Sequence, residues 1–184
     1  VLQNHRGGDW NPGRQTRFGS DPNIPRFTLG PTFDAYWQLK QHLPWLILPA
    51  KDEEWLDEIR ICVEHQYEEY GLKNFTTGAY GAGNYPNQDV YYLLICELAH
   101  RIWGDEKFAD HVELFLDFLE DTVYPMGGMV YHGTQNETFG YHNLNISWIA
   151  RFLEYTGNEQ ARRIIAKTVD FYPIMVEPSG IVEN

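Results

Sequence analysis

Cysteine, basic side chains and long apolar runs are all scarce in this chain of 184 residues. The two cysteines, Cys62 and Cys96, lie within apolar helical patterns, which favours buried free thiols over a disulfide. The sequence has no Cys-x-x-Cys pair or Cys/His spacing typical of zinc. No apolar run reaches the roughly 20 residues of a membrane span. The sequence therefore predicts neither a metal site nor a membrane partner.

Lysine and arginine number 14 against 26 acidic residues, so the net charge is −12. Such a protein repels nucleic acids and other polyanions over most of its surface, and we expect no nucleic-acid partner. The first thirty residues differ, because four arginines outnumber two aspartates there: Arg6, Arg14, Arg17 and Arg26. We therefore divide the chain into an extended basic arm, residues 1–31, and a body, residues 32–184. The arm either guides an anionic ligand or is a solvated tail.

A repeat of 53 residues organises the body. Acidic pairs typical of a helix start occur at 52–53 and 105–106, and Asn158-Glu159 continues the series. They predict amphipathic helices that begin near residues 51, 105 and 158. Gly104 and Gly157 precede the later starts and suit the end of a preceding helix.

The segments 87–103 and 141–156 are apolar over most of their circumference, which predicts helices buried on most sides. Another helix is expected near 32–43, before Pro44 and Pro49. Repeating helical hairpins of this period form solenoids or closed rings. The fold prediction is therefore all-α: helical hairpins that form part of an (α/α)n toroid. About three hairpins are too few to close a ring, so we expect the remainder of the toroid, in further sequence or another chain, as a partner.

Polar residues gather where loops enter the two buried helices. Asn87 and Tyr141 are 54 positions apart, close to the repeat period, so both should lie on one rim of the ring. A helix N-terminus there favours an anion. Tyr141, His142 and His132 could move protons, and Asn87 and Gln88 could donate hydrogen bonds. The alternative is that Asn87 is a helix cap and the Tyr-His pair serves packing.

The second of these junctions carries a family resemblance. Gly127, Tyr131, Glu137 and Tyr141-His142, followed by an apolar helix up to Gly157, resemble the heparinase II/III and oligoalginate lyase group of α/α-toroid polysaccharide lyases. The similarity covers about residues 80–157. It implies that Tyr141 is the catalytic tyrosine and that Asn87, with Asn84 as a second candidate, neutralises a uronate carboxylate. It also implies that Glu137 orients the site; a further histidine typical of the group has no counterpart after residue 142.

The resemblance implies β-elimination on an acidic, uronic-acid-containing polysaccharide, outside the cytoplasm in the periplasm or as a secreted protein. Donors at the carboxylate would stabilise the enolate-like transition state, and positive charge must lower the pKa of a tyrosine that acts as base. This chemistry requires no metal and no organic cofactor. Two alternatives stay open: a glycoside hydrolase that uses Asp89 and Glu137, and a non-catalytic glycan-binding solenoid. Residues assigned to substrate binding are Asn84, Gln88, Gln135, Glu137, Arg14 and Arg17.

Overall fold

The computed structural model describes residues 24–73, 82–131, 138–176 and 179–181, and these residues are predominantly helical. They contain no β-strand; an isolated bridge pairs Val123 with Met129. The all-α prediction is confirmed. None of the helices in this part of the chain is both long and apolar enough to cross a membrane. The elements are α1 (Ile24–His42), η2 (Pro44–Leu46), α2 (Pro49–Gln66), the π-helical η3 (Tyr67–Lys73), α4 (Pro86–Trp103), α5 (Glu106–Thr122), α6 (Phe139–Thr156), α7 (Glu159–Thr168), η4 (Val169–Phe171) and α8 (Tyr172–Met175).

The 53-residue repeat is a repeat of structure. The helices α4 and α6 both have 18 residues and begin 53 positions apart. Each ends at a glycine in the left-handed conformation: Gly104 has φ 71° and Gly157 has φ 66°. Their amides donate to His100 and Leu153, both at 2.8 Å. The expected starts near 51, 105 and 158, and near 87 and 141, are confirmed to within two residues.

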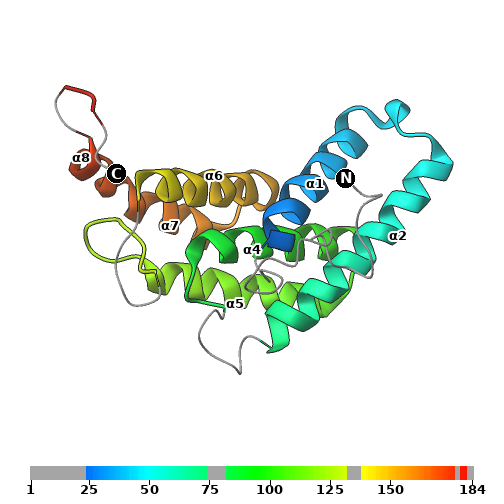
Figure 1. Ribbon diagram of the computed structural model, residues 1–184, viewed down its shortest axis with the longest axis horizontal. Coiled ribbons are helices and arrows are strands. Elements are labelled where there is room, and N and C mark those ends of the chain that lie inside the picture. The colour runs from blue at the N-terminus through cyan, green and yellow to red at the C-terminus, as the bar shows by residue number, and fades with distance from the viewer. Residues whose placement is uncertain (1–23, 74–81, 132–137, 177–178, 182–184) are drawn as a thin grey trace, which may run out of the picture.

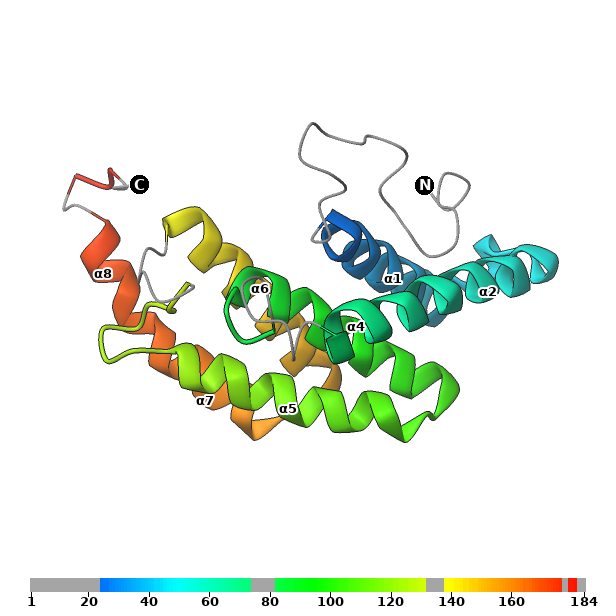
Figure 2. The same cartoon turned by 60° about the horizontal axis from the view of Figure 1, so that its bottom comes forward.

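The hairpins lie side by side in two layers (Figures 1 and 2). In one layer α4 lies between α1 and α6. In the other layer α5 packs against α7, and α5 also packs against α4 across the two layers. Both α4 and α6 begin on the same side of the molecule, at the left of both views. The two loop-to-helix junctions therefore lie at the same end of the hairpins.

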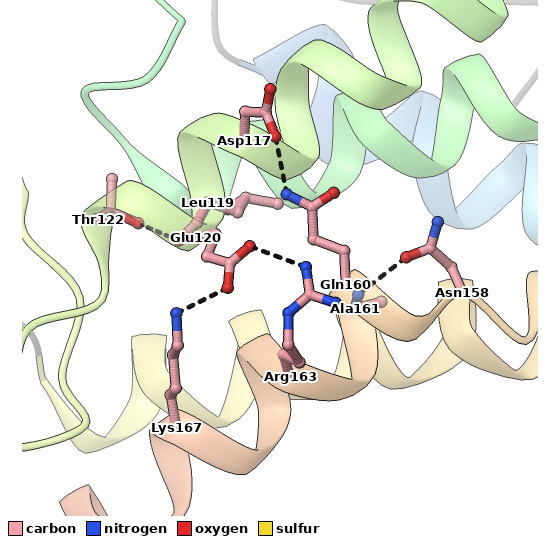
Figure 3. Close-up of polar contacts among 9 residues, drawn as sticks. All are labelled: Asp117, Leu119, Glu120, Thr122, Asn158, Gln160, Ala161, Arg163 and Lys167. Atoms are coloured by element: carbon pink, nitrogen blue, oxygen red, sulfur yellow. Dashed lines mark hydrogen bonds and ion pairs between the residues drawn. The ribbon is translucent and has the colours of Figure 1, made fainter.

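Polar pairs between the outer helices keep the same register from hairpin to hairpin. Lys107 pairs with Glu64 between α5 and α2. Fifty-three residues on, the amide of Gln160 donates to Asp117 at 2.8 Å between α7 and α5 (Figure 3). Glu120 also pairs with a lysine of α7 in that figure. Because exposed ion pairs each contribute only about 0–1 kcal/mol, these contacts mark the register and contribute little to stability.

The two inner helices differ in burial. Most residues of α4 are buried, from Pro86 to Ala99, as expected. In α6 only one face is buried, with His142, Asn145, Ile149 and Phe152. The prediction that both helices are buried on most sides is therefore wrong for α6. The reason is that α4 has a neighbour of its own layer on each side, whereas among the described residues α6 has one only at α4.

The beginning of the body also differs from expectation. The helix α1 starts at Ile24, so residues 24–31 are helical rather than part of an extended arm. Arg26 shares a face of α1 with Leu29 and Phe33, at helical spacing, and all three are fully buried. Arg14 and Arg17 lie outside the described residues. Cys62 and Cys96 are buried and form no disulfide, as expected for both thiols.

Candidate functional site

The N-terminus of α4 carries a buried side-chain amide whose oxygen lacks a hydrogen-bond partner in the described part of the chain. Pro86 occupies the first turn, where its fixed φ and missing N–H suit a helix start. Asn87 is only 7% exposed, and its Oδ1 has no hydrogen-bond partner among the described residues. Leaving a buried polar atom unpaired costs about 1–3 kcal/mol. Such a cost is expected where a ligand completes the hydrogen bonding.

The two inner-helix N-termini are capped differently. The amide of Tyr141 donates to the Thr138 side chain at 3.3 Å, so α6 has a side-chain cap. The first turn of α4 has no side-chain cap among the described residues. The amides of Gln88 and Asp89 donate to the Tyr85 carbonyl and Pro86 has no N–H, so the Asn87 amide and the partial positive charge of the helix end are what this turn offers an anion.

Directly behind this first turn lies a buried polar network. The guanidinium of Arg26 donates to Oε1 of Gln88 at 2.8 Å and to Oε1 of Gln66 at 3.2 Å. It also stacks 3.6 Å from the ring centre of Tyr70. All four residues are buried. The network therefore joins α1, α2 and η3 to the start of α4.

Asp89 completes this network. Its carboxylate accepts from the Tyr70 hydroxyl at 2.6 Å and from the Gly83 amide at 3.2 Å. Burial raises the pKa of Asp89 to about 7, although Tyr70, Gly83 and Arg26 each favour the charged form. Burial also raises the pKa of Tyr70. Because Asp89 is fully buried, it is not placed to protonate a glycosidic oxygen, which counts against the hydrolase alternative.

Tyr141 is the exposed member of the candidate site. Its side chain is 46% exposed at the start of α6, and its ring stacks on that of Tyr131 with centroids 5.7 Å apart. Tyr131 is buried, and its hydroxyl accepts from the Asn145 amide at 2.7 Å. Tyr131 thus fixes one face of the Tyr141 ring. In the 53-residue register the equivalent of Tyr141 is Gln88, one residue after Asn87.

The structure corrects the expected role of His142. This side chain is fully buried and packs against Phe171 and Tyr172, with ring centroids 4.3 and 5.0 Å away. Successive residues of a helix point about 100° apart. When Tyr141 faces solvent, His142 therefore faces the protein interior, and it cannot exchange a proton directly with a substrate.

The other expected site residues divide into two groups. Asn84 is half-buried in the loop that enters α4, close in sequence to Asn87. His132, Gln135 and Glu137 lie outside the described residues, as do the two arm arginines. Among the described residues, no group of three His, Cys, Asp or Glu side chains could hold a metal ion.

The residues that support the site were not predicted from the sequence. Arg26 falls within the expected arm, although its spacing from Leu29 and Phe33 places it on the apolar face of a helix. Tyr70 lies in a π-helical segment that no local sequence signal announced. Comparison with protein-family models, curated proteins and solved structures found no match for this chain.

Proposed function

We propose that this protein is a polysaccharide lyase that cleaves a uronic-acid-containing glycan by β-elimination. The single observation that carries the proposal is Asn87, a buried amide with an unpartnered oxygen at the uncapped N-terminus of α4. Oδ1 only accepts, so Asn87 would meet a carboxylate through the Nδ2 donor after the side-chain amide has rotated. Tyr141, which is exposed, lies in the first turn of the neighbouring helix α6.

In this mechanism the uronate carboxylate lies at the start of α4. Asn87 donates to it from its side-chain and backbone amides and stabilises the negative charge that develops when the adjacent proton leaves. One preorganised donor of this kind contributes about 3 kcal/mol. Tyr141 removes that proton or protonates the oxygen of the departing 4-linked sugar; general acid–base help contributes about 10²–10⁴ in rate. The products are a shortened chain and an unsaturated uronate, with no metal or organic cofactor.

The proposal extends to the ring and its surroundings. Among the described residues α6 has a neighbour of its own layer only at α4, so we propose that the remainder of an (α/α)n toroid, in further sequence or another chain, adjoins its other side. The substrate would then lie along the rim formed by successive inner-helix N-termini. A protein that cleaves polysaccharides meets them outside the cytoplasm, so the periplasm or the exterior is the expected location.

The test is formation of unsaturated uronate, followed by its ultraviolet absorbance, on alginate, heparan sulfate, chondroitin sulfate and polygalacturonate. Tyr141→Phe removes only a hydroxyl from an exposed ring, so turnover should be abolished while substrate binding is nearly unchanged. The matched control is Tyr155→Phe at the other end of α6, where the hydroxyl contacts Asp34 and Gln38. A near-normal kcat in Tyr141→Phe would show that the Tyr141 hydroxyl takes no part in catalysis. New reducing ends without the absorbance would instead indicate a hydrolase.

A further inference from the structure

The turn between α1 and α2 is unlike the turns of the other two hairpins. Two residues join α4 to α5 and two join α6 to α7, whereas residues 43–48 join α1 to α2. This longer turn exposes three large apolar side chains: Trp45 is 73% exposed, Leu46 61% and Leu48 69%. In both views the turn lies at the right-hand edge of the molecule, away from α5, α6 and α7 (Figures 1 and 2). A cluster of exposed apolar side chains of this kind marks a contact surface.

The turn and its flanks, residues 41–50, form an uncharged segment that we call the tip. It contains no lysine, arginine, aspartate or glutamate. The nearest charged side chains in the sequence are themselves paired, because Lys40 contacts Asp52 and Lys51 contacts Glu54. The tip therefore offers no charge to a polar partner, and no charged group has to be desolvated when it leaves water.

The backbone of the tip is also suited to an apolar environment. Pro44 and Pro49 have no N–H to satisfy. The amides of Leu46 and Ile47 donate to carbonyls three residues before them, at 3.0 and 3.1 Å. Lipid tolerates backbone only where its polar groups are absent or are satisfied internally. These four positions of the tip meet that condition.

Contacts behind the tip hold it in place. Ile47 is only 8% exposed and belongs to the hydrophobic core, so one apolar side chain of the turn points inward. The Tyr36 hydroxyl donates to Asp52 at 2.6 Å, and Asp52 also pairs with Lys40, which joins the end of α1 to the start of α2. The exposed side chains are therefore presented by a fixed turn, and little entropy is lost when they bind.

A lipid surface fits this tip better than a second copy of the chain. A projecting apolar tip needs an apolar groove in a protein partner, but a bilayer requires no complementary shape. The second copy offers a cavity of about 650 Å³ along α2, and its lining is mainly ionisable: Asp57, Arg60, Ile61, Glu64, His65 and Glu68. Tryptophan, the most exposed residue of the tip, is enriched where proteins meet the membrane–water interface.

We propose that the tip is a membrane-contact surface, which places Trp45, Leu46 and Leu48 in the headgroup region of an uncharged lipid bilayer. Such a contact enters the bilayer by about 5–10 Å. It needs no membrane span, so the short apolar runs that argued against a membrane partner do not bear on it. The net charge of −12 repels anionic lipid, which makes a zwitterionic surface the better partner. The inference does not depend on the lyase proposal.

Flotation of the 184-residue chain with phosphatidylcholine vesicles tests this inference. The tip variant carries Trp45→Ser, Leu46→Ser and Leu48→Ser, and its urea midpoint should be unchanged because all three side chains are exposed. Burying one such side chain shifts an equilibrium by about tenfold or more. The partition coefficient of the tip variant should therefore fall at least tenfold below that of the wild type.

The matched control removes three apolar side chains elsewhere on the surface. Ile61, Met126 and Ile174 are 48%, 55% and 48% exposed, and none of them lies in the tip. A variant with serine at these three positions should keep a partition coefficient within roughly threefold of wild type. A control loss as large as that of the tip variant would show general surface hydrophobicity and overturn the inference.

Trp45→Phe locates the contact. Phenylalanine keeps an apolar ring, so this variant should still float with the vesicles. Brominated phosphatidylcholine quenches tryptophans that enter the bilayer, so it should quench the wild type and leave Trp45→Phe nearly unquenched. Equal quenching of the two proteins would place a different tryptophan in the lipid and contradict the proposal.

The remaining outcomes also decide the matter. A wild type that does not float, or a tip variant that floats equally well, would overturn the inference. So would stronger binding to vesicles that contain phosphatidylglycerol, because that preference requires a basic surface rather than an uncharged tip. Self-association without lipid that only the tip variant loses, together with no flotation of the wild type, would show that the tip joins two copies of the chain instead.

Discussion

Gly127→Ala is the substitution whose effect on the free energy of unfolding follows most closely from the structure. Gly127 has φ 86° in the loop that joins α5 to Tyr131. An added Cβ would lie 2.7 Å from the backbone nitrogen of Phe171 and 3.1 Å from the carbonyl oxygens of Lys167 and Thr168. These are backbone atoms at the end of α7 and in η4, so they cannot rotate away. The free-energy cost of the steric clash therefore adds to the cost of the left-handed backbone conformation.

A second glycine separates the two contributions. Gly104 has φ 71°, and a Cβ there would meet nothing within 4 Å. Gly104→Ala should cost the backbone term alone, about 1–2 kcal/mol. Gly127→Ala should cost that amount plus about 1–3 kcal/mol for overpacking. With a urea slope of about 2 kcal/mol per molar, the unfolding midpoint of Gly127→Ala should lie roughly 1 M below that of Gly104→Ala.

The assay is urea unfolding of both variants beside the wild type, followed by circular dichroism. Because the same loop carries Tyr131 under the Tyr141 ring, Gly127→Ala should also lower turnover of any accepted glycan, whereas Gly104→Ala should leave it near normal. Equal midpoints for the two variants would show that the loop does not press on η4 as described. The packing account of the Tyr131–Tyr141 pair would then be wrong.

Three further predictions concern the α4 N-terminus and the helix α6. Asn87→Ala should lower kcat by about 10²–10³ without lowering the urea midpoint, because the oxygen it removes has no described partner and its burial is unfavourable. Combined with Tyr141→Phe, it should cost less than the sum of the separate barriers; full additivity would argue against a shared transition state. Burial raises the pKa of Asp89 to about 7, so the folded state holds a proton there between about pH 4 and 7 that the unfolded state has released. The stability that this proton provides is therefore lost as the pH rises through 7. Relative to Asp89→Asn, the free energy of unfolding of the wild type should fall by up to about 1.4 kcal/mol per pH unit between pH 5 and 7. A difference in urea midpoint between the two proteins that stays constant over this pH range would contradict this. The isolated 184-residue chain should self-associate in sedimentation experiments, because α6 has no neighbour of its own layer beyond α4 in the described part of the chain; a stable, soluble monomer would count against a missing partner.

Local signals in the sequence sufficed to predict where the repeated helices begin. Asp105-Glu106 and Asn158-Glu159 begin α5 and α7 because acidic first turns and short polar caps act within one turn of the chain. The left-handed conformation of Gly104 is likewise decided locally. Such features depend on neighbours in sequence, so the 53-residue period predicted the start of each repeated helix to within two residues.

Burial was harder to predict, because it depends on neighbours in space. The apolar pattern of 141–156 resembles that of 87–103, yet only α4 has a described helix on both sides within its layer. His142 and Tyr141 are adjacent in sequence but have opposite exposures. Arg26 reads as a charged arm residue until the helix that contains it is placed against α4. The buried residues that contact the candidate site, such as Arg26, could therefore not be predicted from the residues at the helix N-termini.

The fate of the glycosidic oxygen tests the central claim most directly. Hydrolysis adds one water to each cleaved bond, whereas β-elimination adds none and leaves a double bond in the new non-reducing uronate. Mass spectrometry of the products formed in ¹⁸O-labelled water, with the best acidic glycan of the panel, distinguishes the two. The account predicts unsaturated products without ¹⁸O from the wild type and no products from Tyr141→Phe. Saturated products that carry ¹⁸O, or unsaturated products from Tyr141→Phe at the wild-type rate, would contradict it.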